Sequence, residues 1–244
     1  MVIHVITNVH NEILLMPYFL RHYASFADRI FIYDAMSDDG TREVVAACPK
    51  AELIDWQCHE ANDMEYMALH NSAYIQHSRG VADWVILPDC DEFVYHPEIR
   101  TVLEEYKQVG INLAAPQGYN MMSDQFPTTE GQIYEEVVFG TPYEPECKPI
   151  VFDPMLPMNF GIGKHGLFPF PPEVTVIEAP MRDLKLLHLT GLGRQFRIDR
   201  LAARARRLSQ TNIDNGWGLD VLRTAEEIGE EYDNSWAGVV RVID

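Results

Sequence analysis

Short apolar runs alternate with longer mixed segments through the first half of the chain, and this alternation indicates the fold. The runs are rich in β-branched residues and apolar at successive positions, which is typical of strands buried on both faces of a parallel sheet. Between them, apolar residues recur at helical spacing, as Leu15 and Phe19 do. Strands are expected over residues 2–7, 29–34, 52–56 and 84–88, and helices over residues 12–25, 41–47 and 64–78. This order predicts an α/β fold with a mixed, mainly parallel central sheet.

The second half of the chain has a less regular pattern. Residues 116–180 are rich in proline, glycine and aromatic residues, a composition that favours irregular loops shaping a substrate site. Strands are expected over residues 112–115, 133–139, 149–152, 174–177 and 184–188, and helices over residues 98–108, 194–210 and 219–230. Because no repeat or linker divides the chain, we expect a single domain over residues 1–244.

Composition narrows the classes of protein that fit. The net charge of −18 disfavours nucleic acid as a partner, since such a surface repels a phosphate backbone. The four cysteines form no CxxC pair, which is typical of reduced thiols in a cytoplasmic protein. We find no secretory signal and no apolar stretch of about 18 residues, so a cytoplasmic protein without a transmembrane segment is expected.

An acidic cluster follows the strand expected over residues 84–88. Its sequence is Asp89-Cys90-Asp91-Glu92, at the carboxyl end of that strand. Ligands of open α/β sheets bind at this edge, and two carboxylates in such a turn can hold a magnesium or manganese ion. The alternative is an acidic loop whose side chains only form caps and turns.

A second polar segment, residues 33–41 (YDAMSDDGT), follows the strand over residues 29–34. The Asp34 carboxylate can accept hydrogen bonds from a nucleobase or ribose, while Gly40 permits a tight turn. The alternative is an ordinary turn that leads into the next helix, with Thr41 as its cap.

Together with Asn11-Glu12 and the run WVILPDCDEF, these segments resemble glycosyltransferases of the family-2-like GT-A group. The matching motifs occur in the expected order over residues 1–95. The resemblance implies a Rossmann-like α/β/α sandwich, with a nucleotide-sugar and metal-binding half over residues 1–95. An acceptor half with C-terminal helices would then occupy residues 96–244. Farther along, Lys148 and the histidines His165 and His188 match more loosely.

The same resemblance implies roles for individual residues. Metal ligands would be Asp89 and Asp91, the DxD pair, together with His188. Donor-binding residues would be Asn11, Glu12, Asp34, Asp39, Asp89 and Lys148. A Mn²⁺ or Mg²⁺ ion would act as a Lewis acid as the nucleoside diphosphate leaves. The donor is expected to be a uridine or guanosine diphosphate sugar, and the acceptor a saccharide or a lipid-linked molecule.

An inverting transferase needs a base for the acceptor hydroxyl. Asp124 is the first candidate, because it follows a segment downstream of the acidic cluster, with His165 second and Glu60 third. The segment over residues 118–127 has no match in the family, which leaves the base open. For each residue the alternative is structural, a turn former or a hydrogen-bonded histidine.

Four arginines form a stripe on the helix expected over residues 194–210: Arg197, Arg200, Arg204 and Arg207. One interpretation is contact with an anionic acceptor, such as a lipid-linked phosphate, or with a membrane surface. We favour a core-packed helix whose basic face pairs with this protein's own carboxylates.

Two other functions fit the same fold class. One is a nucleotidyltransferase, which normally has a glycine-rich, basic first loop. Residues 8–12 form the first loop here and are neither glycine-rich nor basic, so this function is ranked lower. A non-catalytic nucleotide- or sugar-binding module is the other alternative. Walker, GxGxxG, HExxH and GxSxG motifs are absent from the sequence, which disfavours kinases, dinucleotide oxidoreductases, zinc hydrolases and α/β-hydrolases.

Overall fold

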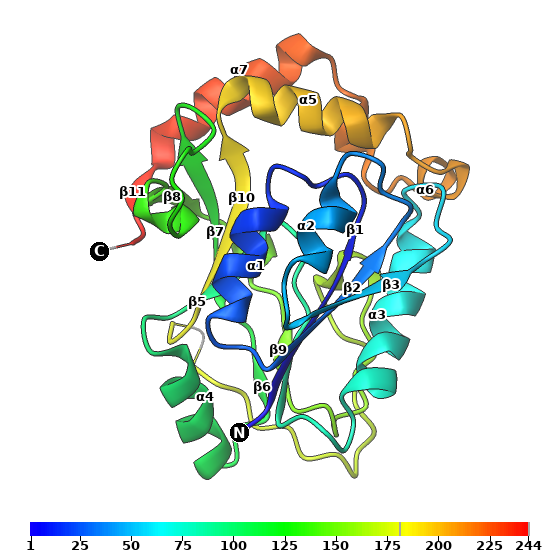
Figure 1. Ribbon diagram of the computed structural model, residues 1–244, viewed down its shortest axis with the longest axis vertical. Coiled ribbons are helices and arrows are strands. Elements are labelled where there is room, and N and C mark those ends of the chain that lie inside the picture. Colours follow the sequence, from blue (N-terminus) through cyan, green and yellow to red (C-terminus); the bar gives the residue numbers. More distant parts are fainter. Residues whose placement is uncertain (181, 244) are drawn as a thin grey trace.

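The computed structural model describes residues 1–180 and 182–243, and two sheets organise them (Figure 1). The first sheet contains, in spatial order, β3 (Ala51–Asp55), β2 (Arg29–Asp34), β1 (Ile3–Val9), β4 (Trp84–Ile86), β9 (Val151–Phe152) and β6 (Leu113–Ala114). The first four strands run parallel, with Val5 opposite Ile30 on one side and Ile86 on the other. Strand β9 is antiparallel to both of its neighbours. The predicted α/β fold with a mixed, mainly parallel sheet is confirmed, and it is the arrangement expected of a GT-A-type chain.

The second sheet contains β11 (Val240–Arg241), β8 (Phe139–Pro142), β7 (Gln117–Ser123), β10 (Lys185–Leu192) and β5 (Glu92–Tyr95), in that order. Strand β10 is parallel to β7 and antiparallel to β5. Because β5 begins soon after β4 ends, the chain passes from one sheet to the other through the acidic cluster. This cluster therefore lies at the junction of the two sheets.

Seven α-helices accompany the strands in the described residues: α1 (Met16–Ala24), α2 (Thr41–Ala46), α3 (Asp63–His77), α4 (Ile99–Gln108), α5 (Arg194–Ala205), α6 (Gln210–Asn215) and α7 (Ala225–Ser235). Strand order runs outward from β1 to β3 and returns to β4 on the other side of β1. Right-handed crossovers then place α1 and α2 on one face of the first sheet and α3 on the opposite face. Figure 1 shows α5 and α7 across the end of the molecule opposite α4.

Local sequence explains where several helices begin. Proline stands in the first turn of α1, where a missing N–H costs nothing. The Asn62 side chain accepts a hydrogen bond from the Met64 N–H at 3.0 Å and so caps α3. Helix α7 begins with a capping box between Thr224 and Glu227. No helix in the described ranges is both long enough and apolar enough to cross a membrane.

Aromatic packing holds α1 against the start of β5. The ring of Phe19 lies edge-on to that of Phe93, with 6.0 Å between centroids, and both residues are fully buried. The buried Tyr23 hydroxyl donates to the Glu92 carbonyl at 2.8 Å and accepts from the Val94 N–H at 3.0 Å. Helix α1 therefore fixes the position of the strand that follows the acidic cluster.

Several expected elements differ from the structure. The helix expected over residues 12–25 begins only at Met16, after a turn. The strand expected over residues 133–139 is a 3₁₀ turn, η1 (Ile133–Glu135), followed by β8. Residues 174–177 form no strand. The residue after them, Glu178, forms an isolated β-bridge with Leu113. The helix expected over residues 194–210 ends at Ala205, and the one over residues 219–230 is divided into η4 (Leu219–Leu222) and α7.

The expected cap of α2 was also wrong. The N-cap is Gly40, with φ of 102°, and Thr41 is the first helical residue. The Thr41 hydroxyl instead accepts a hydrogen bond from the Glu12 N–H at 2.9 Å and donates to Asp39 at 2.6 Å. Its polar group therefore joins the loops after β1 and β2.

Candidate active site

The acidic cluster lies at the carboxyl end of β4, where loops from both sheets meet. The Leu189 N–H donates to the Asp91 carbonyl at 2.7 Å, which joins the cluster to β10. The Asp89 N–H donates to Glu92 Oε2 at 2.8 Å, so the turn is closed by its own carboxylate. The Asp89 side chain is 39% exposed, whereas those of Asp91 and Glu92 are 9% and 0% exposed. Of these three carboxylates, Asp89 is therefore the one open to a ligand.

The Asp91 carboxylate is paired with a cation from the far end of the chain. Arg200 on α5 donates to Asp91 Oδ2 at 2.6 Å and to Glu12 Oε1 at 2.6 Å. His188 Nε2 lies 3.5 Å from the same Asp91 oxygen. Burial alone would raise the pKa of Asp91, but the charges of Arg200 and His188 hold it well below its usual value. Asp91 is therefore ionised at neutral pH.

Two buried lysines neutralise the rest of the cluster. Lys164 Nζ contacts Asp89 Oδ1, and Lys148 Nζ contacts Glu92 Oε1. Lys148 Nζ also lies 2.8 Å from Glu146 Oε2 and 3.8 Å from Asp89 Oδ2. Burial opposes its charge, but these carboxylates raise the pKa of Lys148 above its usual value. Lysine is almost never fully buried unless it is paired, so the carboxylates keep both ammonium groups inside.

Lys164 is held by an unusual backbone. Its φ of 60° and that of Gly163, 65°, are both in the left-handed region, inside the 3₁₀ turn η3 (Ile162–Lys164). A residue other than glycine pays about 1 kcal/mol or more for this conformation, and such strain clusters at functional sites. Tertiary contacts, above all the ion pair with Asp89, keep Lys164 there.

One group of side chains in the described residues is arranged to hold a metal ion. Its members are Glu92, Glu146 and His188, whose ligand atoms all lie within 4.8 Å of one another. Burial opposes protonation of His188, but a hydrogen bond and the charge of Asp91, with the charge of Glu146, raise its pKa overall. His188 Nδ1 is 3.0 Å from Asn120 Oδ1 on β7. The group therefore draws its ligands from two neighbouring strands, β5 and β10, and from the 3₁₀ turn η2 (Glu144–Glu146).

The chemistry of this group fits a divalent cation. Two carboxylates and one imidazole are ordinary ligands for Mn²⁺, and carboxylates suit Mg²⁺. Glu146 Oε2 is buried without a hydrogen bond of good geometry, although the Lys148 ammonium is 2.8 Å away. A cation held here would share Glu92 and Glu146 with Lys148.

The predicted donor-binding residues of the first two loops mainly hold those loops together. The Asn11 side chain donates to Asp38 Oδ1 at 2.8 Å and accepts from the Asp38 N–H at 2.9 Å. Asp39 accepts from the Ile13 N–H at 3.0 Å. Asp34 has no exposed surface and is paired with Arg42. Asn11 is exposed at the sheet edge, whereas a contact from Asp34 to a ligand would require that ion pair to rearrange.

The three predicted catalytic bases lie in different parts of the structure. Asp124 is exposed just after β7, and Glu60 is exposed before α3. His165 is also exposed, and its Nδ1 lies 2.8 Å from the Pro145 carbonyl. It is therefore beside Glu146, on which its charge acts. Of the three, His165 lies at the border of the metal group, and the role of each as a base stays a prediction.

Sequence reasoning missed two of the residues that build this site, Glu146 and Lys164, and did not connect a third, Arg200, with the acidic cluster. Glu146 and Lys164 lie in the irregular middle of the chain, where no motif marks them. Arg200 belonged to the predicted basic stripe, and the expectation that these arginines pair with the protein's own carboxylates is correct for it. It is also correct for Arg197, which is 3.1 Å from Glu231. What the stripe did not reveal is which carboxylates Arg200 binds.

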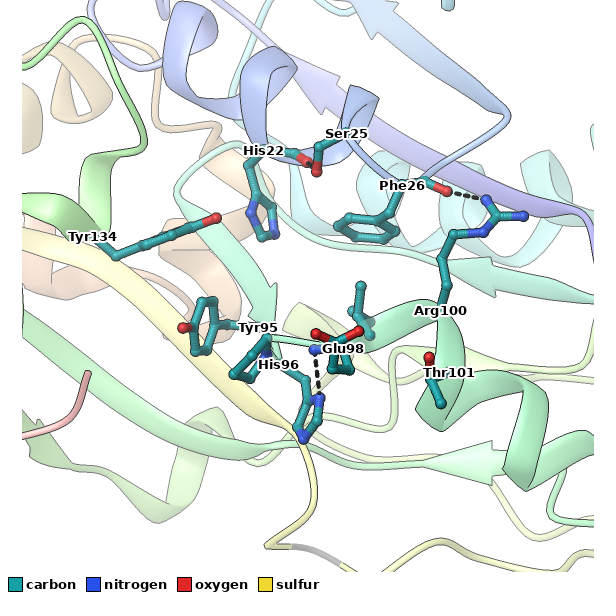
Figure 2. Close-up of a pocket in the computed structure, with 11 residues that line it drawn as sticks. His22, Ser25, Phe26, Tyr95, His96, Glu98, Arg100, Thr101 and Tyr134 are labelled. Carbon is teal, nitrogen blue, oxygen red and sulfur yellow. Dashed lines mark hydrogen bonds between the residues drawn. The ribbon is translucent and has the colours of Figure 1, made fainter. Parts of the chain in front are cut away.

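A cavity of about 460 Å³ lies at the other end of β5, away from the acidic cluster. Figure 2 shows the rings of His22, Phe26, Tyr95 and Tyr134 around it. Burial lowers the pKa of His22 to about 4, so this imidazole is neutral, and its Nε2 donates to the Val94 carbonyl at 3.0 Å. None of the residues that line this cavity belongs to the acidic cluster or to the metal group.

Comparison with known proteins gives only distant structural likenesses. No family model matches the chain, and no curated protein matches it. The structure of S. aureus TarS is similar at 14% identity and a TM-score of 0.41, over 63% of this chain and 28% of TarS. Residues 1–349 of TarS match at 10% identity and a TM-score of 0.46, over 96% of this chain and 71% of that one. Mannosyl-3-phosphoglycerate synthase from Rubrobacter xylanophilus matches at 16% identity and a TM-score of 0.36, over 49% of this chain and 41% of that one. The residues of the site therefore carry the functional argument.

Proposed function

We propose that this protein transfers a sugar from a nucleoside diphosphate sugar to an acceptor hydroxyl, with a divalent cation and with inversion. One observation carries the proposal. The Asp89–Glu92 cluster, at the carboxyl end of a parallel strand, meets His188 from the second sheet and Glu146 from the 3₁₀ turn η2 (Glu144–Glu146). That sheet edge is where open α/β folds bind nucleotides. The sequence resemblance to GT-A glycosyltransferases, which includes the acidic cluster and adds the segments around Asn11 and Asp34, supports the same function.

The cation would be held by Glu92, Glu146 and His188. A Mn²⁺ or Mg²⁺ ion there would neutralise charge on the departing nucleoside diphosphate. Asp91, 3.5 Å from His188, would orient the imidazole as an outer partner, because Arg200 already occupies its carboxylate. This differs from the ligand set expected from sequence, in which Asp89 and Asp91 bind the metal directly.

The donor would lie over Asp89, the exposed carboxylate of the cluster. Lys148 and Lys164 hold Asp89 ionised and in a fixed position, so it can accept hydrogen bonds from ribose hydroxyls. Burial would raise the pKa of Asp89, and the two lysine charges lower it below its usual value. Asn11, exposed on the adjacent loop, would provide a further polar contact.

For the acceptor proton we favour His165 over Asp124. His165 lies beside Glu146, while Asp124 has no contact with the metal group among the described residues. A base has to reach the attacking hydroxyl within hydrogen-bond distance, so proximity to the metal group matters more than residue type. A His165→Ala variant should bind donor normally and lose turnover. Retained turnover would return Asp124 to first place.

The experiment is thermal stability with UDP, GDP, ADP and CDP, each with and without Mn²⁺. A ligand that binds only the folded state raises the melting temperature by mass action. We expect a shift for one nucleotide that requires the metal and disappears in Asp89→Asn. Because Asp89 pairs with the buried Lys164, the melting temperature of this variant without ligand is measured first, and each shift is taken relative to it. Asp214→Asn, at an exposed position on α6, is the matched control.

The outcomes separate the rival functions. No shift with any nucleotide in the wild-type protein would overturn the proposal. A shift without transfer or hydrolysis of UDP-GlcNAc, GDP-mannose or UDP-glucose over a panel of saccharide acceptors would favour a binding module. Turnover of a nucleoside triphosphate to pyrophosphate would identify a nucleotidyltransferase instead.

A further inference from the structure

The arginine stripe begins on α5 and ends just beyond it, and apart from Arg197, which pairs with Glu231, it is attached to the rest of the protein at two places. Arg200 reaches Asp91 and Glu12 at one place. At the other, Arg207 donates to the Cys58 carbonyl at 2.9 Å and the His59 carbonyl at 3.3 Å. The stripe therefore spans the sheet edge from the acidic cluster to the loop after β3.

Arg204 lies between these two attachments. It is one helical turn beyond Arg200, and residues four apart share a helix face. Its side chain is exposed, and within residues 1–180 and 182–243 it forms no ion pair or hydrogen bond. Its charge nevertheless acts on the carboxyls of Glu12, Asp63 and Asp91, which belong to three different segments. Because it shares a helix face with Arg200, which binds Glu12 and Asp91, Arg204 lies on the side of α5 that faces these segments.

The neighbouring carboxylates have other partners. Glu12 and Asp91 are both paired with Arg200. Asp63 interacts with the side chain of Asn212 on α6. In a chain with 37 acidic and 19 basic side chains, an arginine without a partner beside three carboxylates is unusual. All five of its N–H donors remain available to a ligand.

A phosphate is the ligand that this arrangement suits. The guanidinium fork matches phosphate oxygens bidentately, better than a lysine point charge does. A diphosphate approaching Asp89 meets several carboxylates, so it needs a fixed cation on the side away from the metal group. Arg204, one helical turn beyond the arginine that binds Asp91, is placed on α5 to provide that charge.

We propose that Arg204 forms a phosphate-binding subsite for the diphosphate of the donor. This inference rests on the proposed function, and it assigns to α5 the second half of diphosphate recognition, opposite the metal group. The helix would then position the donor as well as close the site, since Arg200 anchors it to the acidic cluster.

The test compares Arg204→Gln with Arg206→Gln by calorimetric titration. Arg206 is exposed at the end of the same helix, off the stripe, so it controls for the loss of one positive charge. The probes are UDP, GDP, ADP and CDP with Mn²⁺, the corresponding nucleosides, and inorganic pyrophosphate. Loss of a charge-assisted hydrogen bond should weaken diphosphate binding about 10- to 100-fold and leave nucleoside binding unchanged. Arg206→Gln should change it less than about twofold.

The outcomes distinguish this inference from the proposed function. Nucleoside diphosphate binding that is equal in wild type and Arg204→Gln would overturn the subsite and leave the proposed function intact. Pyrophosphate binding that depends on Arg204, with no nucleotide binding in the wild-type protein, would retain the subsite and reject the function. If pyrophosphate binding depends on Arg204 but nucleotide binding does not, the assignment of the subsite to the donor diphosphate would be overturned. If neither pyrophosphate nor any nucleotide binds, both proposals fail.

Discussion

Arg200 donates to the Asp91 carboxylate at 2.6 Å, although 109 positions separate the two residues in the chain. The same guanidinium reaches Glu12 at 2.6 Å. Three segments, the loop after β1, the acidic cluster and helix α5, are thus joined by one side chain that is 17% exposed. The edge of the site is therefore completed only when helix α5 is in place.

Arg200→Met should destabilise the protein strongly. It would leave Asp91 and Glu12 without their cation, and breaking a buried pair on one side costs about 3–5 kcal/mol. We expect a loss near the lower value, because Glu12 is 19% exposed and water can solvate it in part. Urea unfolding followed by circular dichroism measures the change.

The matched control is Arg194→Met on the same helix. Its partner is Asp233, and the two side chains are 47% and 60% exposed. An exposed pair of this kind contributes at most about 1 kcal/mol. Equal losses in the two variants would mean that the Arg200 contacts are no more than surface ion pairs.

The first half of the fold could be predicted from the sequence because its signals are local. The strand over residues 29–34 has the predicted bounds, since an apolar run between turn residues specifies a buried strand without help from distant segments. The segment over residues 174–177 has a similar local composition and forms no strand. Whether such a run pairs depends on a neighbour that local pattern does not identify.

The residues of the candidate site also differ in whether the sequence could indicate them. Asp89 and Asp91 stand in a motif that the sequence places after a strand, and the structure has this motif after the end of β4. Glu146 and Lys164 become functional candidates only through contacts across the chain, with Lys148 and with Asp89. No spacing rule connects residues that meet through an irregular segment. The sequence therefore predicts the site's position, and the fold determines its ligands and counter-charges.

His22 should make the protein sensitive to acid. Burial lowers its pKa to about 4 in the folded state, against about 6.5 when unfolded. The unfolded state binds a proton first as pH falls, so stability should drop between about pH 6.5 and pH 4, by up to about 3 kcal/mol. Denaturant midpoints measured at several pH values would show this slope.

His22→Phe should flatten that part of the profile. The new ring can keep the stacking on Phe93, where centroids are 4.9 Å apart and the planes differ by 18°. Loss of the hydrogen bond to Val94 should cost about 1 kcal/mol at pH 7.5. The variant should therefore be less stable than wild type at pH 7.5 and close to it, or more stable, near pH 4.5. His59→Gln, at an exposed position, should leave the slope as it is, and an unchanged slope in His22→Phe would exclude His22 as its source.

Two glycines with free space around them should respond oppositely to alanine. No atom lies within 4 Å of a Cβ built on Gly80 or on Gly166. Gly80 has φ of +76°, which strains an alanine by about 1 kcal/mol, so Gly80→Ala should destabilise. Gly166 lies outside the left-handed region, so Gly166→Ala should be neutral or stabilise by up to about 1 kcal/mol through the unfolded chain. Thermal unfolding decides, and a lower melting temperature for Gly166→Ala would contradict the explanation by backbone angle alone.

The two candidate sets of metal ligands differ in which substitutions should weaken Mn²⁺ binding. If Glu92, Glu146 and His188 hold the ion, Glu146→Gln and His188→Gln should each lower Mn²⁺ affinity at least about tenfold, since even outer-shell partners contribute that much. Asp89→Asn should have a smaller effect, because Lys164 and Lys148 already neutralise that carboxylate. Asp63→Asn, a carboxylate near Asp89 but outside the group, is the control. Electron paramagnetic resonance of free Mn²⁺ measures each affinity directly, without a nucleotide. Loss of binding in Asp89→Asn with normal binding in Glu146→Gln would instead restore the ligand set predicted from sequence, to which His188 also belongs.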